Sequence, residues 1–511
     1  MTQQEKPTIE ELATFCKKKG FVYPSSELYG GLAGLYDYGP LGVELKNNIK
    51  NEFWKTFVQS RQDMLGLDGS IISHQKIWEA SGHLTGFSDL LLECSRCKTK
   101  IRADHFIEEK LKLQAEGFNA TQLSELIKKH KLSCPHCKHP FSDISSFNLM
   151  FQVKVGAEDS SSSLAYLRGE TAQLIFAAFD NVVNTSRAKL PFGIAQIGKA
   201  FRNEIAPRNF LFRLREFEQA EIEYFIHPKK NDFPYTIDKN LTINFLSEAA
   251  QEKKKAAEKV KLAELVKKKL LSEWHAYWLQ ETLIWFHSLG INENNLRIRQ
   301  HLKSELSHYS KATFDIEYNF PDMGWKEIHG CADRQQFDLT QHQTHSKKAL
   351  GIFDEATKER IIPKVIEPSH GIDRLFLTFL YEAYEYDKSR DNIVLHLHPK
   401  LAPIKAAIFP LLSNKPELLK KAKEVFNALK DEFHCFYDDS GSIGRRYSRQ
   451  DENGTKYCIT IDFDSLKQDD VTIRDRDSTS QVRIPIKELK ESLNKLLKAE
   501  IKFESLGRII N

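Results

Sequence analysis

Residues 201–221 constrain the fold of this 511-residue chain more than any other stretch. The segment reads FRNEIAPRNFLFRLREFEQAE, in which two strand-like halves flank a loop that holds Pro207 and Asn209. This pattern predicts a β-hairpin. Because alternate side chains of a strand share one face, Arg202 and Glu204 should lie on one side of the first half. The same rule should place four residues on one side of the second half: Arg213, Arg215, Phe217 and Gln219.

The predicted hairpin carries side chains that suit a nucleotide. An arginine fork donates two parallel hydrogen bonds to phosphate. A ring such as Phe217 can stack on a purine, an interaction of about 1–3 kcal/mol. A solvated edge with ion pairs is the alternative, but charges crowd both faces and apolar rings interrupt them. The segment therefore favours nucleotide binding over a plain surface.

Composition and charge narrow the class of protein. Hydrophobic residues are 41% and charged residues 28% of the chain, which is typical of a folded globular protein. The net charge of +4 does not indicate a nucleic-acid binder, although a basic patch fits within a near-neutral total. Residues 1–18 lack the apolar core of a signal peptide, and no run approaches the roughly 18 apolar residues of a membrane helix. We therefore expect a cytoplasmic protein without a membrane partner.

The pattern of apolar and charged residues divides the chain into a first domain at about 1–390 and a second at about 391–511. Two passages of the first domain look inserted. One is 94–139, which has a helical middle at 107–131. The other is 231–300, where apolar residues recur at helical spacing among many lysines. For these lysines, a solvated helix face and a contact with an RNA backbone are both open.

The second domain alternates short apolar strands with amphipathic helices, a pattern that predicts a small, separate α/β domain. Strands are predicted at 393–397, 406–409 and 458–463. Helices are predicted at 416–430, which begins with a proline, and at 486–497.

Four of the eight cysteines form two close pairs, CSRC and CPHC. The two-residue gap in each pair lets both thiolates bind one tetrahedral zinc ion. Four thiolates leave no open coordination position, so such a zinc would be structural. Reduced thiols in a degenerate loop are the alternative. The predicted ligands are Cys94, Cys97, Cys134 and Cys137.

The hairpin segment resembles motif 2 of class II aminoacyl-tRNA synthetases, and its residue sequence is similar to that of glycyl-tRNA synthetases of the homodimeric type. The similarity extends over nearly the whole chain. Residues 38–47 resemble motif 1, which builds a dimer interface in the family, and residues 367–374 resemble motif 3. Residues 324–334 match another family block, and residues 439–447 resemble the family's anticodon-binding domain.

This resemblance implies a mixed α/β (α+β) fold. A class II catalytic domain, with an antiparallel sheet flanked by helices, would precede a C-terminal α/β anticodon-binding domain. The implied activity joins glycine and ATP into glycyl-adenylate and passes the glycyl group to the 3′ end of tRNA(Gly), releasing AMP and diphosphate. Neither step demands a protein nucleophile, so positioning and charge stabilisation must supply the rate.

The resemblance also assigns roles at an ATP site. Arg202 would hold the α-phosphate, Glu204 would contact the adenine amino group, and Phe217 would stack on the ring. Arg213 would hold the outer phosphates, while Arg374 would cover the other side of the adenine or touch the γ-phosphate. The implied catalytic residues are Arg202, Glu204 and Arg374.

Magnesium is the implied companion of ATP, because it bridges phosphates while keeping several waters. Glu327 is its implied contact. The implied ATP-binding set is Arg202, Asn203, Glu204, Phe212, Arg213, Leu214, Arg215, Glu216, Phe217, Glu327, Ile328, Gly371, Ile372, Asp373 and Arg374.

Glycine offers an ammonium, a carboxylate and no side chain. Members of the family bind the glycine ammonium with acidic residues. Arg102 lies at the position where the family contacts the glycine carboxylate. Rejection of larger amino acids is steric, so no editing domain is expected. The implied glycine-binding set is Arg102, Glu170, Phe217, Glu218, Gln219, Ala220, Glu221, Glu367, Pro368, Ser369, His370 and Gly371.

Arginines of the second domain cluster near Tyr447. Arginine with aromatic residues suits a splayed anticodon loop, where stacking and edge hydrogen bonds recognise the bases. A solvated loop is the alternative, and the resemblance to an anticodon-binding domain favours RNA. The arginines are Arg445, Arg446, Arg449, Arg474 and Arg476.

Two other functions stay open at this point. A non-catalytic accessory subunit of a mitochondrial DNA polymerase resembles the same family, but it would be expected to lose the ATP arginines and glycine carboxylates that this chain retains. A class II synthetase for another small amino acid, such as serine or threonine, is the second. Exchange of pyrophosphate into ATP with glycine, serine and alanine discriminates among the three.

Overall fold

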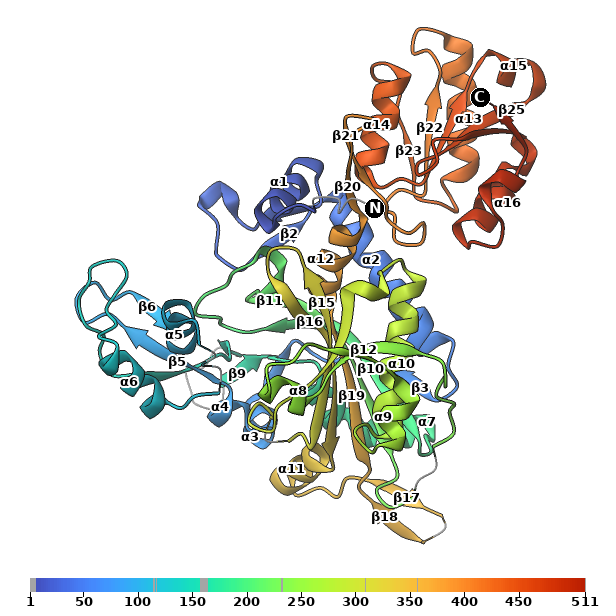
Figure 1. The fold of residues 1–511 in the computed structure, drawn as a ribbon. Coiled ribbons are helices and arrows are strands. Elements are labelled where there is room, and N and C mark those ends of the chain that lie inside the picture. The colour runs from blue at the N-terminus through green and yellow to red at the C-terminus, as the bar shows by residue number, and fades with distance from the viewer. Residues whose placement is uncertain are drawn as a thin grey trace.

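The computed structural model describes residues 6–113, 115, 117–156, 164–230, 233–307, 309–355 and 357–510. A large sheet organises most of the chain, and a second sheet organises the C-terminal part, which stands at one end of the molecule (Figure 1). The segment with the cysteine pairs projects from the side of the main body. The expected mixed α/β class is confirmed. No helix within the described ranges is long and apolar enough to cross a membrane.

Nine strands form the large sheet. In spatial order they are β13 (Glu258–Lys261), β12 (Thr242–Leu246), β14 (Leu296–Gln300), β15 (Ala312–Phe320), β16 (Gly324–Gln335), β19 (Lys364–Gly371), β11 (Glu216–Ile226), β10 (Phe192–Phe201) and β3 (Met64–Gly66). Neighbours pair antiparallel except β12 with β14 and β3 with β10. The expected class II antiparallel sheet is therefore present.

The two faces of this sheet have different partners. One face packs through the main hydrophobic core on α1 (Ile9–Lys19), α2 (Pro40–Trp54), α10 (Glu273–Ser288) and α12 (Ile372–Ala383). The other face is covered at one end by α7 (Ala172–Ser186) and α11 (Phe337–Ser346). Beside these two helices, β11, β16 and β19 contribute residues to the lining of a cavity.

Strand alternation decides which residues of β11 face that cavity. Ala220, Ile222 and Tyr224 enter the main core. The residues between them, Glu221 and Glu223, therefore point to the opposite face. Charged side chains thus lie on one face of a strand whose other face is apolar.

The lysine-rich segment predicted as a helical insertion is only partly helical over its described residues, 233–300. It contributes β12, β13 and β14 to the edge of the large sheet, together with the helices α8 (Glu248–Glu252), α9 (Leu262–Lys267) and α10. Its strands bury Phe245 and Ile298 in the main core. Short apolar runs fit a strand or a helix equally well, which explains the difference.

The segment with the cysteine pairs begins and ends in two adjacent strands. β5 (Ser88–Glu93) pairs with β7 (Ser145–Asn148) and with β6 (Lys100–Arg102). A small core of its own surrounds Phe106 and Leu123. The single helix expected at 107–131 is two helices, α5 (Ala103–Leu111) and α6 (Ala120–Lys129), because Lys112 takes a left-handed backbone and Asn119 begins a new helix with a capping box.

The C-terminal sheet has its own core. Its strands, in order, are β23 (Cys435–Tyr437), β22 (Ala406–Pro410), β24 (Tyr457–Ile461), β25 (Asp470–Asp475), β26 (Gln481–Pro485) and β27 (Arg508–Ile510). Its helices are α13 (Pro416–Leu429), α14 (Ile443–Asn453), α15 (Phe463–Gln468) and α16 (Ile486–Leu497). The predicted helices at 416–430 and 486–497 and the strand at 406–409 are confirmed. The strand predicted at 458–463 is β24, which ends at Ile461 because Asp462 caps α15. The strand predicted at 393–397 is β21 (Asn392–Leu395), which pairs with β20 (Tyr384–Asp387) outside this sheet.

Shorter elements surround the large sheet. They are β1 (Val22–Pro24), β2 (Tyr36–Tyr38), β4 (Ile72–His74), α3 (Gln75–Ala80), α4 (His83–Gly86), β8 (Gln152–Lys154), β9 (Leu164–Leu167), β17 (Ile352–Asp354) and β18 (Glu359–Ile361). β4, β9 and β8 form a small sheet, and the chain that leaves β9 carries Glu170 to the cavity.

Candidate active site

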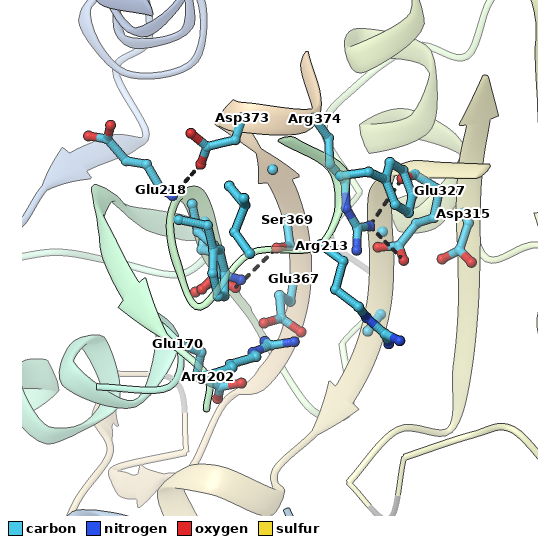
Figure 2. A pocket seen from close by; sticks show the side chains of 18 of the residues that line it. Glu170, Arg202, Arg213, Glu218, Asp315, Glu327, Glu367, Ser369, Asp373 and Arg374 are labelled. Carbon is cyan, nitrogen blue, oxygen red and sulfur yellow. Dashed lines mark hydrogen bonds and ion pairs between the residues drawn. The ribbon is translucent and has the colours of Figure 1, made fainter. Parts of the chain in front are cut away.

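A cavity of about 280 Å³ opens over β11, β16 and β19. Glu170 and Arg202 lie toward one end, and Arg374, Glu327 and Asp315 lie toward the other (Figure 2). The lining residues are Glu170, Arg202, Glu204, Leu211, Phe212, Arg213, Leu214, Phe217, Glu218, Gln219, Glu221, His301, Ser307, Tyr309, Thr313, Asp315, Glu327, Gly330, Ala332, Glu367, Ser369, Gly371, Asp373 and Arg374.

The hairpin exists, but its strands end earlier than the sequence suggested. Residues 202–215 form an irregular loop between β10 and β11. Because side chains do not alternate in an irregular loop, Arg215 does not share a side with Arg213. It donates instead to the carbonyls of Ala33 at 3.0 Å and Glu204 at 3.1 Å and lies outside the cavity lining.

Arg202 is held by two aromatic rings. Its guanidinium carbon lies 5.1 Å from the ring centre of Phe87 and 5.2 Å from that of Phe217. Its Nε donates to the carbonyl of Gly169 at 3.2 Å. No carboxylate of the described residues forms an ion pair with it, so its outer N–H groups stay available to an anion.

Arg213 lies between a carboxylate and an imidazole. Its Nε is 3.5 Å from Oε2 of Glu204, and its Nη1 is 3.2 Å from Nε2 of His105. Burial, together with the charge of Arg102, lowers the pKa of His105 to about 3. The ring is therefore neutral and can accept a hydrogen bond. Because His105 belongs to α5, the segment with the cysteine pairs touches this end of the cavity.

Arg374 lies in the first turn of α12, which begins at Ile372 as the resemblance to motif 3 implied. Its Nη1 is 3.0 Å from the carboxylate of Glu327. Its guanidinium carbon is 4.5 Å from the ring centre of Phe212. The arginine thus covers an aromatic surface at the outer end of the cavity.

Asp315 was missed by sequence reasoning, although an acidic residue inside the apolar run of β15 was an available signal. The neighbouring His301 lies 2.6 Å from its carboxylate. Burial and the charge of Glu327 raise the pKa of Asp315 to about 6. Asp315 and Glu327 are therefore two acids close enough to repel each other.

Hydrogen bonds lock Glu221 in the deeper part of the cavity. One oxygen accepts from the amides of Thr171 at 2.9 Å and Ala172 at 2.8 Å, and the other accepts from Oγ of Ser369 at 3.0 Å. The two amides begin α7, so the positive end of a helix dipole faces the carboxylate. Burial and the charge of Glu170 nonetheless raise the pKa of Glu221.

Glu170 has three partners of its own. Nε2 of Gln173 donates to it at 3.0 Å, Nε2 of His83 lies at 3.4 Å, and Nη2 of Arg334 lies at 3.7 Å. Burial disfavours its ionised form, but these partners outweigh burial and hold the pKa of Glu170 below its usual range. It is therefore ionised at neutral pH.

Arg334 is a buried cation that sequence reasoning missed. It is 1% exposed and binds both oxygens of Glu367, at 2.9 and 3.0 Å, and both oxygens of Asp338, each at 2.8 Å. The guanidinium carbon also lies 3.9 Å from the ring centre of Tyr309. Burial raises the pKa of Glu367 to about 8, although Arg334 opposes the shift. Its place at the end of the family block 324–334 was the available signal.

Several predicted residues lie away from the cavity. Arg102, expected at the glycine carboxylate, is bound by Asp104 at 2.8 Å and by Asp89 at 3.2 Å. Glu218 reaches the cavity edge, but its carboxylate lies 3.1 Å from Lys46 on α2. Neighbouring residues of a strand cannot both face the cavity, which explains why many members of the predicted blocks lie outside its lining. The other predicted residues outside the lining are Asn203, Arg215, Glu216, Ala220, Ile328, Pro368, His370 and Ile372.

The four predicted zinc ligands lie together, with their sulfur atoms within 4.8 Å of one another. The Sγ atoms of Cys94 and Cys137 are 3.3 Å apart, and those of Cys97 and Cys134 are 3.6 Å apart. A tetrahedron with Zn–S bonds of about 2.3 Å has edges of about 3.8 Å. The spacing and the donor chemistry therefore fit one zinc ion.

The C-terminal arginines mostly support the fold. Arg446, Arg474 and Arg476 are buried. Arg474 donates to both oxygens of Asp451, at 2.8 and 3.0 Å, and the other two donate to backbone carbonyls. The sequence suggested that this arginine cluster suits an anticodon loop. These three members are instead buried, and most of their N–H groups bind the protein itself, while Nε of Arg446 has no partner among the described residues. Arg445 is exposed on α14.

Comparison with protein families assigns the architecture. Residues 151–246 match the family described as the tRNA synthetase class II core domain (G, H, P, S and T), and residues 405–496 match the family described as the anticodon binding domain. The first match contains the hairpin and Glu170. With the antiparallel sheet and the arginine-lined cavity, these matches define a class II aminoacyl-tRNA synthetase.

Curated relatives narrow the family. The glycine–tRNA ligase of Caldanaerobacter subterraneus subsp. tengcongensis is 46% identical over 506 residues, which cover 98% of this chain and 99% of the relative. The glycine–tRNA ligase of Clostridium kluyveri is 46% identical over 506 residues, with 97% and 99% covered. That of Geobacillus thermodenitrificans is 46% identical over 497 residues, with 96% and 97% covered. The chain belongs to the glycine–tRNA ligase family, which confirms the resemblance stated above.

Proposed function

We propose that the chain activates glycine with ATP and transfers the glycyl group to tRNA(Gly). One observation carries the proposal: a single small cavity is lined both by arginines, Arg202, Arg213 and Arg374, and by buried carboxyl groups. The arginines suit phosphates, and the carboxyl groups suit an ammonium ion. The carboxylate of a bound amino acid would then lie between the two groups, next to the α-phosphate of ATP.

The first step joins glycine to AMP. A glycine carboxylate oxygen attacks the α-phosphorus, and diphosphate leaves. Negative charge gathers on the α-phosphate oxygens, where we assign Arg202 because its outer N–H groups are not neutralised by a protein carboxylate. The rings of Phe87 and Phe217 fix its position. We assign the outer phosphates to Arg213 and Arg374, and the adenine amino group to Glu204.

Magnesium would be held by Glu327 and Asp315. Their carboxylates lie at the outer end of the cavity (Figure 2), and Mg²⁺ prefers such hard oxygen ligands. The raised pKa of Asp315, about 6, reflects burial and a like charge that a cation would offset. When bound, the ion would neutralise charge on the phosphate oxygens.

We assign the deeper end of the cavity to the glycine ammonium. Glu170 supplies a full negative charge, and Glu221 and Glu367 extend the acidic surface. Ser369 and Gln219 donate to Glu221 at 3.0 and 2.9 Å, so the wall around it is fixed by hydrogen bonds. A larger amino acid would have to displace these side chains, which explains selection of glycine by size.

The second step attaches glycine to tRNA. A ribose hydroxyl attacks the glycyl carbonyl carbon, and AMP leaves. A groove of about 830 Å³ adjoins the cavity and shares Arg213, Glu327 and Arg374 with it. We infer that the tRNA 3′ end approaches through this groove, because basic side chains line it. They include Arg208, Lys254, Lys255 and Lys326.

The same proposal divides the chain near residue 390. The catalytic domain would comprise 1–390, and residues 391–511 would bind the anticodon arm. The match of residues 405–496 to an anticodon binding domain supports this division, as does the separate core of the second sheet.

A homodimer is a further part of the proposal. β3 is an edge strand of the large sheet, so one side of its backbone is unpaired by that sheet. Leu28 and Tyr29 are 86% and 88% exposed, and Val43 on α2 is 41% exposed. A second copy of the chain would cover such apolar residues and the edge. Light scattering should give twice the mass of one chain, and a monomer at micromolar concentration would contradict this assignment.

Structural zinc on the four cysteines and a cytoplasmic location complete the proposal. A reducing compartment keeps thiols available as metal ligands. Metal analysis of the purified chain should find about one zinc per chain, and Cys97→Ser should lower the zinc content. An unsubstituted chain without zinc after purification in zinc-containing medium would refute the metal site.

Exchange of labelled pyrophosphate into ATP tests the central assignment. Glycine should support exchange, while serine and alanine should not, because each adds atoms where the cavity wall is fixed. Exchange with serine alone would refute the glycine assignment. Exchange with none of the three would favour a non-catalytic accessory subunit, although the cavity retains the arginines and carboxyl groups that such a subunit would be expected to lose.

A further inference from the structure

Glu223 is a buried carboxyl group that the proposed reaction does not use. It is 0% exposed, and neither of its oxygens has a hydrogen-bond partner among the described residues. It follows Glu221 on the cavity side of β11. Its neighbour on β10 is Ile194, and Phe225 lies next along the same face. Glu223 therefore lies where the polar cavity gives way to an apolar core.

The pairing of β11 with β19 sets a second carboxyl group opposite Glu223. Tyr224 pairs with Ile366 in this antiparallel ladder, so Glu223 faces Glu367. Side chains in such positions have Cβ atoms about 4.5–5.5 Å apart, and like charges there destabilise the sheet. Glu223 is 0% exposed and Glu367, at the cavity wall, is 6% exposed, so ionisation of both would be especially unfavourable.

The surroundings hold more acids than bases. Among the described residues, five buried carboxyl groups lie near one buried guanidinium that pairs with them, that of Arg334. The buried Arg168 donates to the carbonyls of Lys199 and Gly69 and acts on Glu221 only through its charge. Leaving several uncompensated charges in apolar surroundings is costly, and a proton on one acid relieves the cost. The carboxyl groups belong to Glu170, Glu221, Glu223, Asp338 and Glu367, while His83 adjoins Glu170 and Tyr309 adjoins Arg334.

Titration properties point to the same pair. Burial, followed by the charge of Glu367, raises the pKa of Glu223 well above its usual range. Burial raises the pKa of Glu367 to about 8. Arg334 binds both oxygens of Glu367, whereas no donor of the described residues stabilises an ionised Glu223. The free protein would therefore keep a proton on this pair at neutral pH.

We propose that Glu223 and Glu367 share one proton in the free protein and release it when the glycine ammonium enters the cavity. The inference rests on the proposed function, because it takes glycine as the ligand. The ammonium brings the positive charge that lets the second carboxyl group ionise. Because the bound state holds one proton fewer, affinity for glycine rises with pH, by up to about tenfold per pH unit below the pKa of the pair. Glu223 is thus a positioning residue that acts through Glu367.

Calorimetric titration of the full chain with glycine tests this coupling. Measurements near pH 7 in two buffers of different ionisation enthalpy count the protons released, and about one per glycine is expected. The glycine Kd should also fall as the pH rises from about 6 to 8. Glu223→Gln keeps the shape but cannot hold the proton, so the proton count should approach zero and the pH dependence should flatten. Glu264→Gln, an exposed carboxyl group on α9, should change neither.

Two outcomes overturn the inference: no proton released by the unsubstituted chain, or an unchanged proton count in Glu223→Gln. The first measurement decides the matter even where the variant fails to fold. Absence of any glycine binding would refute the proposed function instead, so the two failures are distinguishable.

Discussion

Arginines near the cavity and arginines in the C-terminal sheet region differ in what occupies their N–H groups. Arg202 contacts two rings and one carbonyl, and its outer N–H groups meet no protein carboxylate of the described residues. Arg474 also lies over a ring, that of Tyr447 at 4.9 Å, but it gives two hydrogen bonds to Asp451. Both arginines were expected to bind a nucleotide or an RNA base. Two hydrogen bonds to one buried carboxylate separate Arg474 from Arg202. Arg213 and Arg374 each have a single carboxylate neighbour, Glu204 and Glu327, and still line the cavity.

The largest expected effect concerns the supporting arginine. Arg474→Ala leaves Asp451 buried with one remaining arginine partner, Arg390 at 3.2 Å. Loss of one member of a buried pair costs about 3–5 kcal/mol. Amide hydrogen exchange in β25 should report this loss of local stability, while glycine-dependent exchange of pyrophosphate should stay unchanged. Arg449→Ala is the matched control, since its side chain is 41% exposed. If Arg474→Ala kept the amide protection of β25 but bound tRNA more weakly, Arg474 would be a binding residue rather than a supporting one.

The next effect concerns the binding arginine. Arg202→Ala should lower kcat of pyrophosphate exchange about 10²- to 10³-fold, because one charge-stabilising donor is lost. Thermal unfolding should change little, since the side chain has no ion pair to lose. Arg202→Lys keeps the charge but not the fork, so it should recover only part of the rate. If Arg202→Ala unfolded more easily yet retained kcat, Arg202 would be a supporting residue like Arg474.

A smaller effect concerns the neighbour of Arg213. His105→Ala removes one acceptor at 3.2 Å, so KM for ATP should rise about 2- to 10-fold with kcat nearly constant. The pKa of His105 is lowered to about 3, so its ring stays neutral above about pH 4 and the contact should be independent of pH from there to neutrality. His130→Ala, on the exposed end of α6, is the control. A KM that changes steeply between pH 5 and about 7 would contradict a neutral ring.

The smallest effect concerns the exposed member of the C-terminal cluster. Arg445→Ala should weaken tRNA binding only a few-fold and reduce the salt dependence of log Kd by about one unit of slope. Protein stability should not change, because the side chain is exposed. Filter binding at several salt concentrations measures the slope. An unchanged slope would place the RNA contact elsewhere on this part of the chain.

Local physics explains what the sequence predicted well. α13 begins with Pro416, whose ring suits the first turn of a helix. β11 follows the alternation of apolar and charged residues, and α12 begins where motif 3 suggests. In these elements the predicted boundaries lie within a few residues of the observed ones.

Long-range partners explain what the sequence did not predict. Arg102 is bound by Asp104, two residues away, and by Asp89 on β5, whereas Arg474 is bound by Asp451, 23 residues away. No local pattern shows which acid an arginine will meet after folding. Arg334 was missed for the same reason, since Glu367 lies on another strand. The site was therefore predictable as a set of blocks, while the free or paired state of each arginine needed the fold.

The segment with the cysteine pairs leaves and rejoins the main body through neighbouring strands, with Ser88 opposite Asn148. Closing a long loop costs little more free energy than closing a short one. During synthesis the catalytic sheet can thus be completed while the four thiols still lack a metal. Under the zinc assignment proposed above, zinc supply would govern when His105 settles beside Arg213, and so how soon a new molecule reaches full affinity for ATP, rather than whether it folds.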